Sequence, residues 1–148
     1  MTTTKADGAK NRTHAKSPSL GIDTHDLART VSSVRKGFSY SKIAHFQKYS
    51  GLSVERISRI TQIPQRTLSR RQDEGRLHAD ESDRLLRISR IFDQAVALFE
   101  GDVSAARHWL ESPQRGLGGE VPLDFASTEI GAREVENLIG RLEYGVFA

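Results

Sequence analysis

Apolar residues recur with helical spacing from residue 26 to the end of the chain. Leu27, Val31 and Val34 fall at i, i+4 and i+7 after Asp26, which predicts a helix that ends at Gly37. The same spacing, with capping residues at the starts and Gly or Pro at the ends, predicts helices from Ser39 or Ser41 to Tyr49 and over Val54–Ile60, Pro64–Glu74, Asp80–Phe99, Val103–Leu110 and Gly131–Tyr144, with a single turn over Pro122–Ala126. No segment of four or more residues alternates like a strand, so the predicted fold is all-α.

The first 25 residues lack this pattern. Met1–Ile22 is rich in Thr, Lys, Gly and Ser and cannot bury enough apolar surface to offset its chain entropy. We therefore expect a disordered basic arm over residues 1–25. Two helical parts follow, over residues 26–100 and 101–148, with Gly101 at the break between them.

Composition narrows the class of protein. The chain has 148 residues, of which 36% are hydrophobic, and it has no cysteine, which excludes a disulfide framework and a thiolate metal site. No uncharged stretch is long enough to cross a membrane and the N-terminus lacks an apolar signal region, so we expect a soluble, cytoplasmic protein.

Charge is divided unevenly between the two halves. Residues 1–76 carry 15 Lys and Arg against 6 Asp and Glu, while residues 77–148 carry 7 against 13. A net charge of +9 attracts polyanions such as nucleic acid, and a net charge of −6 suits a protein surface. Both halves could equally be solvated faces without a partner.

A helix-turn-helix is the main binding motif. The helices Val54–Ile60 and Pro64–Glu74 are joined by three residues, the length typical of DNA-binding pairs. Gln62 lies where many such turns need a positive φ angle and have glycine. The exposed face of the second helix offers side chains that contact bases or phosphates: Gln65, Arg66, Thr67, Ser69, Arg70 and Arg71. The alternative is a two-helix corner with a solvated basic face.

No pattern indicates an enzyme. The five histidines have no metal-ligand spacing, and no nucleophile motif is present, so we expect no metal, no cofactor and no catalytic residue. Gly116–Gly119 resembles part of a phosphate loop but lacks a following GK[ST]; we expect a tight turn that exposes Leu117. The single tryptophan, Trp109, is expected in the core.

The chain resembles the Xre/ParS/MbcA-type antitoxins. The resemblance covers residues 39–148 and is carried by Arg66–Arg71, Glu81–Arg87, Trp109-Leu110, Pro113, Leu117-Gly118-Gly119, Pro122-Leu123-Asp124, Gly131-Ala132 and Tyr144-Gly145-Val146. It implies an Xre-like helix-turn-helix domain for DNA binding and dimerisation over residues 26–100, followed by a small helical toxin-binding domain over 101–148.

The resemblance also implies partners. These are a cognate RES-domain toxin that consumes NAD, and operator DNA through which the antitoxin represses its own operon. The toxin-facing residues would be Leu117, Gly118, Gly119, Pro122, Leu123, Tyr144, Gly145, Val146, Phe147 and Ala148. Independently of the family, the apolar end of the chain should pack either on its own core or into a groove of a partner.

Two further expectations follow. We expect a homodimer, since one helix-turn-helix makes few base contacts and a two-fold axis matches a palindromic operator. The expected interface is the Leu27–Tyr49 region, because its six large apolar residues exceed what a small core could hide: Val31, Val34, Phe38, Ile43, Phe46 and Tyr49. The alternative function is a stand-alone dimeric DNA-binding transcriptional regulator.

Overall fold

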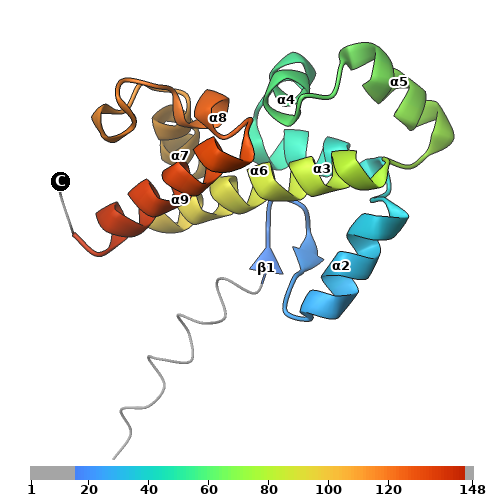
Figure 1. Cartoon of the computed structure of the whole chain (residues 1–148), viewed down its shortest axis with the longest axis horizontal. Coiled ribbons are helices and arrows are strands. Elements are labelled where there is room, and N and C mark those ends of the chain that lie inside the picture. The colour runs from blue at the N-terminus through green and yellow to red at the C-terminus, as the bar shows by residue number, and fades with distance from the viewer. Residues whose placement is uncertain (1–15, 146–148) are drawn as a thin grey trace, which may run out of the picture.

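The computed structural model describes residues 16–145 and shows helices arranged around one long central helix (Figure 1). In chain order the elements are β1 (Lys16–Ser17), β2 (Ile22–Asp23), α2 (Leu27–Lys36), α3 (Ser41–Ser50), α4 (Val54–Thr61), α5 (Gln65–Glu74), α6 (Ala79–Leu98), α7 (Val103–Leu110), the 3-10 turn η1 (Arg115–Leu117), α8 (Pro122–Phe125) and α9 (Glu129–Glu143). The predicted all-α class is confirmed. No helix within this described range is long and apolar enough to cross a membrane.

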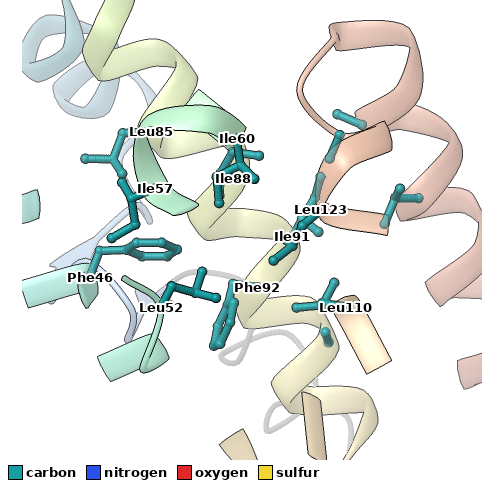
Figure 2. Packing of buried hydrophobic residues seen from close by; sticks show 14 of the residues in the cluster. Phe46, Leu52, Ile57, Ile60, Leu85, Ile88, Ile91, Phe92, Leu110 and Leu123 are labelled. Atoms are coloured by element: carbon teal, nitrogen blue, oxygen red, sulfur yellow. The ribbon is translucent and has the colours of Figure 1, made fainter. Parts of the chain in front are cut away.

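The helix α6 joins the N-terminal and C-terminal parts into one core. Its apolar stripe packs against α4 on one side and against α7 and α9 on others. Figure 2 shows Phe46 and Ile57 near Leu85, and Leu110 and Leu123 near the other end of the same stripe. All of these side chains are 0% exposed. The two parts therefore share one continuous core along α6.

Side chains fix the helix starts. Asp26, Ser53 and Asp102 each accept a hydrogen bond from a backbone N–H three residues later, at 3.0–3.1 Å, as their sequence positions predict. The helix α9 starts earlier than predicted, because Thr128 is its cap and accepts from the N–H of Gly131 at 3.0 Å.

The expectation of a disordered arm over residues 1–25 is wrong for residues 16–23. Here β1 and β2 form a short antiparallel hairpin, with Lys16 opposite Asp23, and Leu20 at its tip is fully buried. Asp93 of α6 holds the hairpin, accepting from the hydroxyl of Ser17 at 2.7 Å and from the N–H of Ser19 at 3.0 Å. One buried leucine and a few specific hydrogen bonds outweigh the polar composition. Residues 1–15 of the expected arm lie outside the described residues.

Most of the apolar side chains expected at a dimer interface over Leu27–Tyr49 are instead buried or half-buried in the core. Phe38, Ile43 and Phe46 are at most 5% exposed, because the long stripe of α6 offers them a core. Val34 and Tyr49 are half-buried against the same core. Within Leu27–Tyr49, the large apolar side chains that remain in solvent are both on α2, namely Leu27, 75% exposed, and Val31, 40% exposed. They line a groove of about 540 Å³ between α2, α6 and the hairpin.

Candidate functional site

The turn between α4 and α5 has the geometry that the sequence predicts for a helix-turn-helix. Gln62 adopts the left-handed conformation with φ 56°, a position that glycine fills more easily. The N–H of Ile63 donates to the carbonyl of Ser58 at 3.0 Å, and the Ser58 hydroxyl donates back to the carbonyl of Ile63 at 2.6 Å. These reciprocal bonds hold α5 at a fixed angle to α4.

One face of α5 is free for a partner. Leu68, 1% exposed, is its only buried apolar residue. Gln65, Arg66, Ser69 and Arg70 are exposed and Thr67 is half-buried, all as expected for a contact face. Neither Arg66 nor Arg70 forms an ion pair with any carboxylate of residues 16–145; Arg70 donates only to the Thr67 hydroxyl, at 3.5 Å. The face thus presents two uncompensated guanidinium groups beside amide and hydroxyl groups.

Arg71 is not part of this face, contrary to the prediction. It is 8% exposed, and its Nε donates to Oε1 of Glu81 at 2.8 Å. Because Arg71 lies three residues after Leu68, it falls on the inward stripe of α5. Burial opposes ionisation of Glu81, but hydrogen bonds from Arg71 and from the N–H of His78 hold its pKa below the usual value. Arg71 therefore fastens α5 to the start of α6.

The loop between α7 and α8 turns its apolar residues inward. Leu117 is 7% exposed and Leu123 is 0% exposed, with Pro122 also buried, so the expected exposure of Leu117 is wrong. Gly116 allows this close packing, since a Cβ there would lie 2.7 Å from Cδ1 of Leu138. Of the residues that the resemblance assigns to the toxin in this loop, Gly118 and Gly119 are exposed.

The C-terminal end of α9 carries an exposed aromatic residue. Tyr144 is 82% exposed and Gly145 is also exposed, while Val146, Phe147 and Ala148 lie outside the described residues. The sequence analysis missed Ile130, which is 80% exposed at the other end of α9. Ile130 lies off the apolar stripe formed by Ala132, Val135 and Ile139, and this position could have predicted that its side chain is exposed.

A buried arginine connects the helix-turn-helix to the C-terminal segments. Arg56 of α4 donates through Nε to Oε1 of Glu111 at 2.9 Å and through Nη1 to Oδ1 of Asp124 in α8. Burial works against its charge, but the hydrogen bonds to Asp124 and Glu111 outweigh this and raise the pKa of Arg56. The first helix of the motif is therefore tied directly to the segment around α8.

The chain matches two family models that meet inside α6. Residues 20–90 match the antitoxin Xre-like helix-turn-helix domain, and residues 94–145 match the antitoxin Xre/MbcA/ParS C-terminal toxin-binding domain. The curated antitoxin Xre of Yersinia enterocolitica is 39% identical over 138 residues, which cover 93% of each chain. The antitoxin Xre of Photorhabdus laumondii is 37% identical over 141 residues, or 87% of this chain and 95% of that one. Over 84 residues, 56% of this chain and 52% of the relative, the antitoxin Xre of Pseudomonas putida is also 37% identical.

The fold and the two family matches together define the chain as an antitoxin that combines a helix-turn-helix with a toxin-binding domain. The chain belongs to the Xre/MbcA/ParS antitoxin family. It binds a toxin through its C-terminal domain and is not an enzyme. This favours the antitoxin over the stand-alone regulator as its class.

Proposed function

We propose that this antitoxin inhibits a NAD-consuming RES-domain toxin by covering its active site, and represses its own operon through α5. The observation that carries the proposal is the placement of the two candidate surfaces. The helix α5 and the C-terminal end of α9 lie toward opposite ends of the molecule (Figure 1). One chain can therefore hold DNA and a toxin at the same time.

The chemistry of α5 supports DNA as its partner. Arginine pairs with guanine O6 and N7, glutamine pairs with adenine N6 and N7, and hydroxyl groups bond phosphates or bases. The exposed groups of α5 are of these types, and they belong to the half of the chain with net charge +9. The DNA-contacting residues we propose are Gln65, Arg66, Thr67, Ser69 and Arg70.

Replacing Arg66 and Arg70 together by alanine tests this assignment. For each base that loses its arginine, binding to a promoter duplex from upstream of this gene should weaken by about 1–3 kcal/mol, as measured by fluorescence anisotropy. Arg115 and Arg133 are exposed in the C-terminal half, so their double alanine variant removes the same charge far from α5. Equal affinities for the two double variants would refute the assignment.

We propose as toxin-contacting residues those assigned positions whose surface is exposed. Gly118, Gly119, Tyr144 and Gly145 are the exposed positions among those that the resemblance assigns, and Val146, Phe147 and Ala148 continue the chain from them. Leu117, Pro122 and Leu123 support this surface from the core instead of contacting the toxin.

A homodimer is the form in which we expect the antitoxin to bind DNA. Leu27 and Val31 lie one turn apart on α2, and burying both against a second copy would remove the large apolar side chains that α2 leaves in solvent. Light scattering should show a dimer at micromolar concentration and a monomer for Leu27→Asp with Val31→Asp. If the wild type is a monomer, the proposed dimer is wrong. If the variant is still a dimer, the interface does not lie on α2.

A further inference from the structure

Besides the apolar groove, the structure has a second hollow with a basic lining. It lies on the opposite face of α2. Arg29, Ser33 and Lys36 fall at i, i+4 and i+7 of this helix and line a pocket of about 260 Å³. The pocket is also lined by the hairpin and the segment 37–39, with Lys42 from α3 and Arg76 from the connection between α5 and α6. Four cations from three parts of the chain therefore converge on one small cavity.

The positive charge of this pocket is not neutralised within the described residues. Arg29, Lys36, Lys42 and Arg76 form no ion pair with a carboxylate of residues 16–145. The pocket lining contains one acidic side chain, Asp23, which accepts from the N–H of His25 at 2.8 Å. Four cations against one carboxylate leave a lining of net charge +3, which favours an anion.

Two of the cations are held in place by neutral groups. Arg76 donates through Nη1 to the carbonyl of Gly37 at 2.7 Å, and Lys42 donates through Nζ to the carbonyl of Leu20 at 3.2 Å. Carbonyl oxygens fix the direction of these side chains without cancelling their charge. The cations are therefore positioned before any ligand arrives, which lowers the entropy cost of binding.

The pocket is connected directly to the end of α5. The N–H of Tyr40 donates to the carbonyl of Gly75, the residue that follows α5, at 3.0 Å. The N–H of Leu77 donates to the carbonyl of Phe38 at 2.8 Å, so the segments on both sides of Arg76 are bonded to the pocket wall. These hydrogen bonds fix the pocket wall against the C-terminal end of α5.

We propose that this pocket binds a phosphate group, and that its source is the sugar–phosphate backbone of the DNA bound by α5. The guanidinium and ammonium groups would hold the phosphate oxygens, with the Ser33 hydroxyl as a further donor. Such a contact carries no sequence information and sets the position of the protein on the duplex. This inference rests on the proposed DNA binding by α5.

The salt dependence of DNA binding tests the pocket. Arg29→Gln with Lys36→Gln removes two cations whose side chains make no ion pair within residues 16–145, and keeps long polar side chains. The control is Arg35→Gln with Lys48→Gln, which removes two cations that do not line this pocket. The slope of log affinity against log salt, measured on the promoter duplex, should become shallower by about 1 for each phosphate that the pocket variant no longer binds. The control should change much less.

The outcomes separate the two proposals. Equal slopes for the pocket variant and the control would overturn the proposal that the pocket binds a DNA phosphate, and would leave the proposed DNA binding by α5 intact. A wild-type chain that binds no duplex would overturn both. In a second experiment, AMP is titrated into the wild type and the pocket variant in a thermal-shift assay. If AMP stabilises only the wild type, and the pocket variant leaves the salt slope of DNA binding unchanged, the phosphate comes from a free nucleotide. That result would overturn the proposal that the DNA backbone supplies it.

Discussion

The α5 face and the segment from Leu117 to Leu123 were both predicted as contact surfaces, and they differ in the structure. Five of the six residues predicted on α5 are exposed or half-buried, whereas Leu117, Pro122 and Leu123 are in the core. The difference lies in chemistry. A helix with one apolar anchor leaves its polar residues in solvent, but apolar residues of a family motif are buried first by the chain's own core.

This contrast changes how the C-terminal motif is interpreted. Leu117 and Leu123 shape the loop from within, and their burial leaves glycines 118 and 119 on its surface. Toxin contact is then expected at exposed backbone and at the end of α9. A substitution in the motif can therefore abolish inhibition by unfolding the surface rather than by removing a contact.

The largest expected effect comes from Leu123. Leu123→Ala removes a side chain that is 0% exposed and should lower the free energy of unfolding by about 2–5 kcal/mol. Ile130→Ala is the control, because Ile130 is 80% exposed and should change stability by less than about 0.5 kcal/mol. Urea denaturation followed by circular dichroism measures both. A stable Leu123→Ala variant that fails to bind toxin would restore Leu123 as a contact residue.

The adjacent arginines Arg70 and Arg71 test the same contrast within α5. Arg71→Ala leaves the buried carboxylate of Glu81 without its 2.8 Å partner, so we expect the melting temperature to fall by several degrees. Arg70→Ala should leave the melting temperature unchanged and weaken DNA binding. Differential scanning fluorimetry and anisotropy on the two variants give both readouts. The reverse pattern would place Arg71 on the DNA.

The smallest effect is a pH dependence from Glu81. Its folded pKa is lowered, so its contribution to stability is complete above its unfolded pKa, about 4.3, and is lost as pH falls through the lower folded pKa. Glu81→Gln should be less stable than the wild type at neutral pH, and the difference should shrink in acid. Thermal unfolding of both proteins from pH 7 to pH 3 measures this difference in stability. A difference that stays constant with pH would show that Glu81 acts by shape alone.

Much of the fold follows from local rules that act within a few residues. Ser53 and Asp102 start helices because their side chains satisfy free N–H groups, and Gln62 adopts its positive φ because the turn length demands it. The exposed face of α5 was predictable for a similar reason. Its residues are polar and have no apolar stripe to bury them.

What could not be predicted depends on partners distant in sequence. Arg71 is buried because it pairs with Glu81 at the start of α6, and Leu20 is buried because Asp93 holds the hairpin against α6. Arg56 pairs with residues 55 and 68 positions away. Spacing along one helix does not identify such partners, and composition pointed in the wrong direction for the hairpin.

The central proposal is that toxin binding and DNA binding occupy separate ends of this antitoxin. The direct measurement uses two variants, the deletion of Tyr144–Ala148 and Arg66→Ala with Arg70→Ala, each tested for binding to the promoter duplex and for protection of NAD from the proposed RES-domain partner toxin. Each Val- or Phe-sized side chain buried in a partner contributes roughly 1.5–3 kcal/mol, so the deletion should weaken inhibition by orders of magnitude and leave DNA affinity intact. The arginine variant should do the opposite. Full NAD protection by a deletion variant that retains its helical circular dichroism would contradict the account.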